Sequence, residues 1–409
     1  YRGYRQLSQD ASFPLCLSLP LTPIFPAIIM EKIRKRTNVY MKLNDRNTTP
    51  FSFIKKPDKK MTSSLILAVL SVLLLGCART FPVFAQWYSV TIYAGLKNTI
   101  ARFSGLFPFS LSEAGLYLLL AFCLYWILHS LKRPLLLFKN AFFLASLLFF
   151  IYTINCGINY YRKPFSEEAG FSEELKKGST AAELYSLCEY LVKQVNETVP
   201  GEDSPKRNAF FFRSMGELGQ EAMANLGADF PQLGGWYPYP KPLLNPRLLS
   251  VQQLTGIYSP FTIEANYNSE MPFYNIPHTI CHELSHLKGY MREDEANFIG
   301  YLACIGSDAE AFQYSGYLTG WVYAGNALAK ADFEGYCRLY EQLDPQAIED
   351  LGENNRFWDQ FEGTVAEVST KVNDTYLKAH SQTDGVKSYG RMVDLMLVYY
   401  RSFSETSYR

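Results

Sequence analysis

The pattern of apolar and polar positions divides the chain near residue 160. Before that point, three long apolar runs follow one another closely, at 62–78, 111–131 and 135–160. Each is long enough to cross a bilayer as a helix, the first only just. Aromatic residues typical of membrane interfaces, such as Trp87 and Tyr161, lie close to the runs. We therefore predict a membrane domain over 61–161 that contains three transmembrane helices.

After residue 162, apolar positions recur at the spacing of amphipathic helices, with polar and glycine-rich breaks between them. Thr180-Ala-Ala-Glu183 is a capping box that opens one helix, and another is expected over 214–226. The segment 254–268 alternates partly and is rich in β-branched and aromatic residues, which predicts a short strand or hairpin. The region 162–409 is long enough to build its own core, so we predict an α-rich α+β domain.

The first 60 residues have a different character, because prolines interrupt their only apolar run. We assign no fold to 1–60 and expect a leader that is disordered or untranslated, with Met61 among the possible starts. Leu74-Leu75-Gly76-Cys77, inside the first run, resembles a lipobox, so a lipidated Cys77 is an alternative anchor.

Charge narrows the picture further. The 39 basic and 39 acidic residues balance, which gives no reason to expect nucleic acid as a partner. The 8 cysteines form no C-x-x-C pair, so neither a zinc ribbon nor a disulfide framework is indicated. Lysines precede the first run, and Lys132, Arg133 and Lys139 lie between the second and third. These sites are expected to be cytoplasmic, which places the domain after residue 162 outside.

One stretch carries candidate chemistry, the H-E-x-x-H motif at 282–286. Its surroundings favour a helix, which Gly289 would end. On a helix, His282 and His286 lie on one face and can present two imidazoles to one metal ion. Glu283 lies next to that face and can act as a general base. The motif therefore predicts a peptidase in which a zinc-activated water attacks the peptide bond.

A catalytic zinc site needs a third protein ligand and one open position. Glu293 and Glu295 are the candidates, on a second helix that is expected to fold back onto the histidines. The segment Glu293-x-x-Ala296-Asn297 resembles the E-x-x-A-D segment of gluzincin peptidases. That resemblance implies Glu293 as the ligand and Asn297 as the residue that supports a ligating histidine. Asn in place of Asp, and a short spacing after His286, depart from the gluzincin pattern, so Glu295 stays the alternative.

Six further residues are candidates for contacts with the substrate or the transition state: Glu264, Asn266, His278, Tyr314, Tyr317 and Arg391. The first two lie on the expected strand, where zincins pair extended substrates with a sheet edge. The histidine lies one turn before the motif. The last three could donate hydrogen bonds to an oxyanion. For each of them, ordinary packing or a surface contact is the alternative.

Several segments together resemble DUF3810, a family of bacterial membrane proteins with three N-terminal spans. The shared features are a Gly-Leu-Phe-Pro-Phe-Ser stretch at Gly105–Ser110, a Gly-x-Tyr-x-Pro-Phe-Thr-x-Glu-Ala-Asn segment at Gly256–Asn266, and an extended H-E-x-x-H motif over His282–Phe298. The similarity covers about 61–401. It implies a zincin-like metallopeptidase in the bacterial inner membrane, although the family has no assigned activity.

We therefore predict a mainly α-helical protein with three transmembrane helices, followed by an extracytoplasmic zincin-like domain over 162–409. Zn²⁺ is the expected cofactor, and peptides or envelope proteins are the expected substrates. The rival prediction is a non-catalytic envelope scaffold or sensor that keeps a metal-binding helix pair. An open coordination position beside Glu283 favours the enzyme, and a fourth protein ligand favours the rival. The sequence leaves the oligomeric state open.

Overall fold

The computed structural model describes residues 58–201, 209–379 and 391–406. Its contacts divide the chain into Tyr1–Thr62, which is described only from Asp58, and Ser63–Arg409. The predicted leader, 1–60, therefore lies almost wholly outside the described residues. The predicted domain boundary at 161/162 stays a prediction. Several hydrogen bonds described below join residues before this boundary to residues after it.

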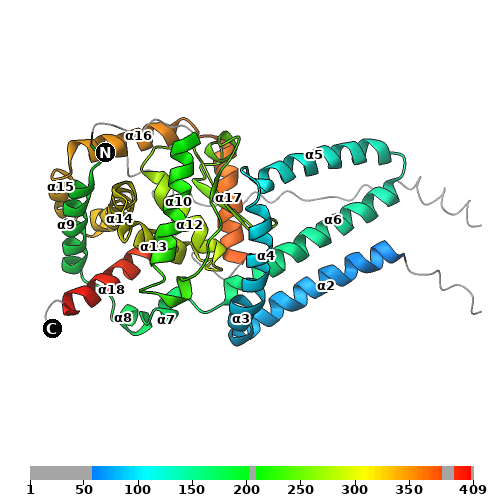
Figure 1. Ribbon diagram of the computed structural model, residues 1–409, viewed down its shortest axis with the longest axis horizontal. Helices are drawn as coiled ribbons and strands as arrows, with labels where there is room; N and C mark the ends of the chain where they lie inside the picture. Colours follow the sequence, from blue (N-terminus) through cyan, green and yellow to red (C-terminus); the bar gives the residue numbers. More distant parts are fainter. Residues whose placement is uncertain (1–57, 202–208, 380–390, 407–409) are drawn as a thin grey trace, which may run out of the picture. The chain divides into compact units, whose positions relative to one another are not determined.

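Helices make up most of the described chain, with a small sheet among them (Figure 1). This confirms the predicted mainly helical class. In chain order the elements are α2 (Lys59–Thr80), α3 (Pro82–Tyr88), the π-helix η2 (Ser89–Tyr93), α4 (Ala94–Ser104), α5 (Leu111–Ser130), α6 (Pro134–Asn155), the 3₁₀ helix η3 (Gly157–Tyr161), α7 (Phe165–Glu168), α8 (Ser172–Lys176), α9 (Ala181–Thr198), α10 (Ala209–Asn225), η4 (Pro231–Leu233), β1 (Lys241–Pro242), α11 (Arg247–Ser250), β2 (Gly256–Ser259), β3 (Glu264–Tyr267), α12 (Asn275–Leu287), α13 (Glu293–Ile305), α14 (Glu310–Ala331), α15 (Phe333–Tyr340), α16 (Pro345–Asp359), α17 (Thr364–Ala379) and α18 (Arg391–Thr406).

Helices α2, α5 and α6 are long and apolar enough to cross a membrane, as predicted from the three apolar runs. The third helix ends at Asn155, earlier than the predicted 160. Its end is polar and buried: the Asn155 side chain donates to the Pro260 carbonyl oxygen at 2.8 Å. At Gly157 the chain passes so close to α2 that an added Cβ would lie 2.9 Å from Leu75 Cδ2. The chain therefore leaves the apolar helix here and continues as η3.

The predicted hairpin over 254–268 is present as β2 and β3, which pair antiparallel with Ile257 opposite Asn266. A short strand that the pattern did not predict, β1, pairs in parallel with β3. The strand order is β1-β3-β2, so β2 is an edge strand of this sheet. It lies against α12.

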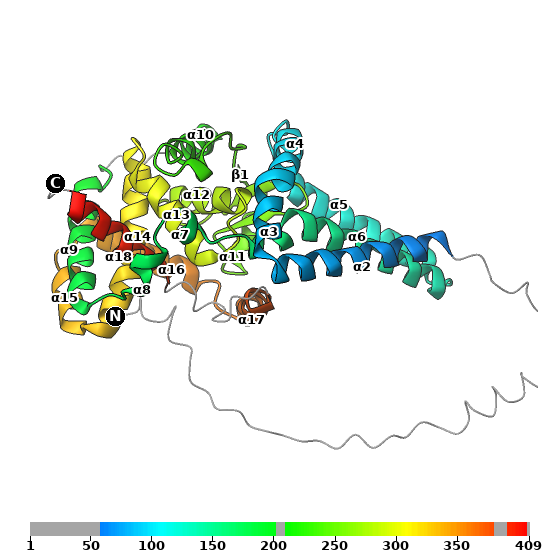
Figure 2. The ribbon, with the colours of Figure 1, turned by 90° about the horizontal axis from the view of Figure 1, so that it is seen from below.

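The helices α12 and α13 pack between α10 and α14 (Figure 2). Ile280, Leu284 and Leu287 form the predicted apolar side of α12 and are fully buried. At Gly219 of α10, an added Cβ would lie 2.3 Å from the Ile280 side chain, so glycine allows α10 and α12 to approach closely. The predicted capping box is confirmed at the start of α9, where Thr180 and Glu183 cap each other.

Candidate metal centre

The H-E-x-x-H motif lies on α12. The turn after α12 reverses the chain, so that α13 packs along α12. Gly289 makes this turn with a φ of +95°, in the left-handed region that favours glycine. At Gly300 of α13, an added Cβ would lie 3.1 Å from the backbone nitrogen of His282. Glycine therefore favours the close antiparallel packing of α12 and α13, because a larger residue would force the helices slightly apart. This packing brings Glu293, the first residue of α13, next to the histidines.

His282, His286 and Glu293 form a group whose ligand atoms all lie within 4.8 Å of one another. The His282 Nε2 lies 3.3 Å from one carboxylate oxygen of Glu293, and the His286 Nε2 lies 3.6 Å from the other. The two imidazole rings are perpendicular, with an interplanar angle of 88°. The side chains keep 12%, 9% and 17% of their surface exposed, respectively. All three side chains are therefore mostly buried, and each keeps a small exposed surface.

This arrangement fits a zinc ion. Tetrahedral zinc with bonds of about 2.0–2.1 Å holds its ligand atoms about 3.4 Å apart, which is close to both measured separations. Two imidazoles and one carboxylate are also a donor set found in catalytic zinc sites, where a fourth position stays open. Among the described residues, this group comprises three protein ligands.

The two histidines are oriented differently. The His286 Nδ1 lies 2.8 Å from the Tyr290 carbonyl oxygen, so Nδ1 carries the hydrogen and Nε2 is left to face Glu293. The buried His282 Nδ1 and the Asn297 Nδ2 both lack a hydrogen-bond partner in the described part of the chain. The role of Asn297 in supporting a ligating histidine, which the gluzincin resemblance implies, therefore stays a prediction.

Protonation in the group is set by burial and by the mutual charges. Burial lowers the pKa of His286 to about 4, against the opposing effect of Glu293. Burial also pushes the pKa of His282 down, but Glu293 outweighs burial and the net pKa is raised. For Glu293 itself, the effect of the histidines outweighs burial and lowers the pKa. An ionised carboxylate and a neutral imidazole are the states in which these groups bind a metal. The pKa shifts of Glu293 and His286 favour these states, whereas the raised pKa of His282 favours a proton that a bound ion would displace.

Glu283 is buried beside the group and is only partly satisfied. Its Oε2 has no hydrogen-bond partner among the described residues. Burial raises the pKa of Glu283 to about 8, although the backbone N–H of Tyr258 acts in the opposite direction. Gly256 on β2 provides the space, because an added Cβ would lie 2.5 Å from the Glu283 Oε1. A carboxyl with a raised pKa and a free oxygen is suited to accept and release a proton.

Residues between α2 and α5 and shortly after α6 hold the C-terminal end of α12. The Tyr93 hydroxyl, at the end of η2, donates to the Leu287 carbonyl oxygen at 2.9 Å. The Arg162 guanidinium, just after η3, donates to the Lys288 carbonyl oxygen at 3.0 Å. The last carbonyls of a helix have no partner within the helix, so these two donors complete α12 and fix its position.

The same segments hold β2. The Tyr258 hydroxyl donates to the Asn155 carbonyl oxygen at 3.0 Å and lies 3.0 Å from the Tyr93 hydroxyl. The end of the third apolar helix thus contacts the strand that faces Glu283.

Comparison with known proteins confirms the family that the sequence motifs resemble. The family described as a protein of unknown function, DUF3810, matches residues 88–397. The chain belongs to the DUF3810 family. No curated protein and no solved structure matches it. The family therefore supplies no activity, and a functional argument has to rest on the geometry of the site.

In this DUF3810 protein, His278, a predicted substrate contact, and Glu295, the alternative ligand, both point away from the metal group. The His278 Nε2 lies 3.0 Å from the Asn297 carbonyl oxygen, so this histidine joins α12 to α13. Burial raises the pKa of Glu295 to about 7, while the backbone of Phe165 and Ser166 acts in the opposite direction. The Glu295 carboxyl therefore lies toward the start of α7, and the acidic residue grouped with the two histidines is Glu293.

Glu264 and Asn266, predicted to face a substrate groove, are buried in the junction with α5. Glu264 forms a buried ion pair with Lys241 at 2.6 Å and accepts from the backbone nitrogens of Leu111 and Ser112 at 3.1 and 2.8 Å. The Asn266 side chain donates to the Ser112 hydroxyl at 3.1 Å. We assign both a structural role, because these contacts tie β3 to the start of a membrane helix.

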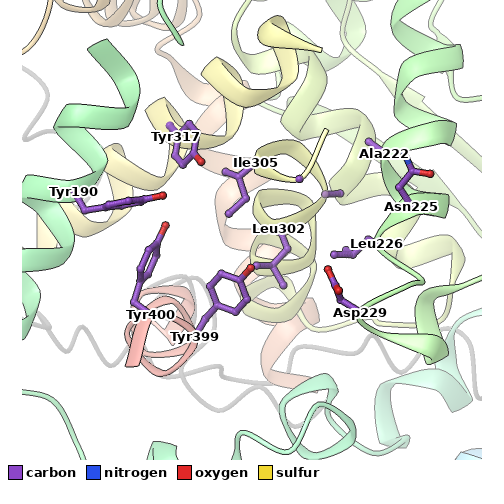
Figure 3. Close-up of a pocket in the computed structure, with 12 residues that line it drawn as sticks. Tyr190, Ala222, Asn225, Leu226, Asp229, Leu302, Ile305, Tyr317, Tyr399 and Tyr400 are labelled. Atoms are coloured by element: carbon purple, nitrogen blue, oxygen red, sulfur yellow. The ribbon is translucent and has the colours of Figure 1, made fainter. Parts of the chain in front are cut away.

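The three predicted oxyanion donors also have other partners. Tyr314 donates to Asp350, and Arg391 forms an ion pair with Asp294 at 2.8 Å. Tyr317 lines a pocket of about 490 Å³, together with Tyr190, Tyr400 and the C-terminal end of α13 (Figure 3). Glu293 begins that helix, and its 13 residues span about 18 Å. Tyr317 therefore lies at the far end of α13 from the metal group.

Three residues near Glu293 were not identified from the sequence. Cys156 and Tyr160 follow α6, and Tyr323 lies on α14. Burial raises the pKa of all three, and the charge of Glu293 raises each further. The Cys156 pKa reaches about 12, so this thiol stays protonated. All three are distant from the motif in sequence, and no local pattern indicates that they meet it.

Proposed function

We propose that this protein is a membrane-anchored, zinc-dependent peptidase with a zincin-like site. One observation carries the proposal. His282, His286 and Glu293 converge at metal-ligand distances, beside the buried Glu283, which has an uncommitted oxygen. Stability alone does not explain an unpaired buried carboxyl oxygen, because leaving it unpaired costs free energy.

The roles follow from the positions. The two histidines and Glu293 would hold a zinc ion, which when bound supplies a Lewis acid for the scissile carbonyl and lowers the pKa of water. Glu283 accepts a proton from the attacking water and passes it to the leaving amine. The raised pKa of Glu283 suits both steps, since the group has to bind and release a proton near neutral pH. Tyr323 is the candidate donor to the developing oxyanion.

The edge strand β2 is the candidate substrate platform. Its Gly256 and Tyr258 lie against Glu283, and β2 has a sheet neighbour on one side only. An extended peptide along the other side would bring a peptide bond to Glu283 through main-chain pairing. Main-chain pairing does not distinguish substrate side chains. We therefore expect the position of a peptide bond along β2, more than the side chains around it, to decide which bond is cleaved.

The proposed location is the bacterial inner membrane, with the metal group on the extracytoplasmic side. The turn between α5 and α6 carries Lys132 and Arg133, which supports a cytoplasmic position for this turn. The opposite ends of α5 and α6 bond to β3 and β2, through Glu264 of β3 and through the Tyr258 hydroxyl of β2, which donates to the Asn155 carbonyl oxygen. The catalytic domain would then follow on the outer side.

The test is metal content and hydrolysis by the full-length protein in detergent micelles. We expect about one zinc per chain in the wild type and in Glu283→Gln, and little in Glu293→Ala, which removes one of three ligands. Hydrolysis is measured on random-sequence peptides, both soluble and tethered to a bilayer. We expect cleavage by the wild type only.

Two results would contradict the proposal in different ways. Equal zinc content in all three proteins would refute the ligand set. Zinc binding without hydrolysis of either kind of peptide would instead support the rival prediction of a non-catalytic scaffold or sensor.

A further inference from the structure

We infer that the substrate is a polypeptide anchored in the same membrane and cleaved within a few residues of the bilayer surface. The inference rests on the peptidase activity proposed above and narrows its substrate class. It is carried by the short path from the third membrane helix to Glu293, by exposed aromatic residues along that path, and by the amphipathic helix α17.

The path from membrane to metal group is short. Helix α6 has 22 residues and is about 33 Å long, which matches the hydrocarbon thickness of a bilayer. Its last residue, Asn155, would therefore lie at the membrane surface. The 3₁₀ helix η3 follows and rises only about 10 Å. Cys156, directly before η3, has its Sγ 3.6 Å from the Met291 Sδ, and Met291 lies two residues before Glu293 in the chain.

Exposed aromatic side chains lie near the end of α6, where the membrane surface is expected. Phe261, at the tip of the β2–β3 hairpin, is 47% exposed, and its neighbour Pro260 accepts the hydrogen bond from Asn155. Phe81 and Trp87, directly after α2, are 59% and 51% exposed. Large aromatics at the ends of membrane helices are typical of the lipid headgroup region. The hairpin that carries β2 therefore reaches this region.

Helix α17 extends the apolar surface. Val365, Val368 and Val372 lie on one face of α17 by their spacing, and each is more than half exposed. Tyr376 lies on the same face, and its hydroxyl accepts hydrogen bonds from Tyr152 of α6 and Tyr160 of η3, both at 3.0 Å. This face is therefore turned toward the end of α6, and its exposed valines fit a helix lying in the membrane surface.

These features favour a tethered substrate. A soluble peptide would have to enter the headgroup layer before it could pair with β2. A polypeptide anchored in the same bilayer is already confined to that layer, which raises its effective concentration at the site. The cleaved bond would lie near the anchor of the substrate, because the metal group itself lies near the membrane.

The experiment uses the full-length protein, loaded with zinc, in liposomes of phosphatidylethanolamine and phosphatidylglycerol. Reporters carry one random-sequence cassette in three settings: directly after a transmembrane helix, after a flexible linker of about 40 residues that reaches roughly 35 Å, or as a free peptide. We expect the membrane-proximal cassette to be cleaved at least about tenfold faster than the other two. Glu283→Gln should cleave none.

The outcomes separate the two proposals. Equal cleavage of the three reporters would overturn the inference and leave the peptidase proposal in place. No cleavage of any reporter would overturn both. Cleavage that persists in Glu283→Gln would show that the measured hydrolysis does not come from this site.

A second measurement does not depend on activity. Tryptophan is introduced in Val368→Trp, or in the matched control Glu367→Trp on a different face of α17. The five native tryptophans are accounted for by subtracting the wild-type signal. We expect lipids brominated near the headgroup to quench Val368→Trp and to leave Glu367→Trp largely unquenched. Equal quenching of the two variants would overturn the membrane contact of α17.

Discussion

Glu264 and Glu283 lie on neighbouring elements, β3 and α12, and both are almost fully buried, at 3% and 4% exposed. Glu264 is fully engaged, with Lys241 on one side and the first two backbone nitrogens of α5 on the other. Glu283 instead keeps one oxygen without a partner among the described residues. Burial of a carboxylate therefore does not indicate a functional role by itself. An unpaired carboxylate oxygen next to other reactive groups does indicate one.

The largest expected effect is on the rate of hydrolysis, and it distinguishes Glu283 from Glu264. Glu283→Gln should lower the rate of hydrolysis by about 10²–10⁴-fold, because a general acid–base group contributes that much. Its folding stability should not fall, because the amide is neutral and replaces a carboxyl whose pKa burial has raised to about 8.

Hydrolysis assays and thermal unfolding in micelles check this pair of expectations. The matched control is Glu295→Gln, at another buried carboxyl with a raised pKa. It should keep the rate. A Glu283→Gln protein that unfolds several degrees earlier would mean that Glu283 is a structural residue like Glu264.

The second expected effect is on stability. Lys241→Met should destabilise the fold by about 3–5 kcal/mol, because it leaves the Glu264 carboxylate buried without its cation. Denaturant unfolding in micelles measures this loss. Arg247→Met is the control, since Arg247 pairs with Glu270 at 3.2 Å while 63% exposed, and such pairs contribute at most about 1 kcal/mol. Equal losses in both variants would refute the structural role of the buried pair.

A third, smaller effect concerns the candidate oxyanion donor. Tyr323→Phe should slow hydrolysis by about 10²-fold with unchanged zinc content, as expected when one donor is lost. Tyr314→Phe removes the hydroxyl of another tyrosine of α14, which donates to Asp350, and should leave the rate unchanged. Steady-state kinetics of both proteins checks this. A rate loss in Tyr314→Phe alone would restore the donor predicted from the sequence.

The smallest effect tests the turn behind His286. Gly289→Ala forces a side chain into a φ of +95°, at a cost of about 1–2 kcal/mol, and should shift the Tyr290 carbonyl that orients His286. Zinc affinity should then fall by about tenfold, measured by chelator competition. Gly178→Ala carries a similar strain at φ +70° in open space, and should leave zinc affinity unchanged.

Local pattern accounts for much of the fold. The three helices apolar enough to cross a membrane, the capping box at Thr180 and the H-E-x-x-H helix were all predictable, because each depends on residues within a few turns. The choice between Glu293 and Glu295 was harder. Two residues apart on a helix, they face about 200° away from each other, and only the packing of α13 on α12 at Gly300 decides which one meets the histidines.

The remaining site residues could not be predicted, because their partners are remote in sequence. Glu264 is a plausible groove residue by local pattern, and its structural role depends on a start of α5 that lies 152 and 153 positions earlier. Tyr160 and Tyr323 reach Glu293 from elements on either side of the motif. Nothing in their immediate sequence indicates chemistry.

The hydrogen bond from Tyr93 to the last turn of α12 has a consequence for biogenesis. Its donor lies between the first and second membrane helices, and its acceptor lies in the H-E-x-x-H helix. We expect the metal group to reach its final geometry only after the membrane helices have inserted and brought Tyr93 into place. Under the peptidase activity and outward orientation proposed above, a chain still in transit would have no competent site, which would protect the cell interior from premature proteolysis.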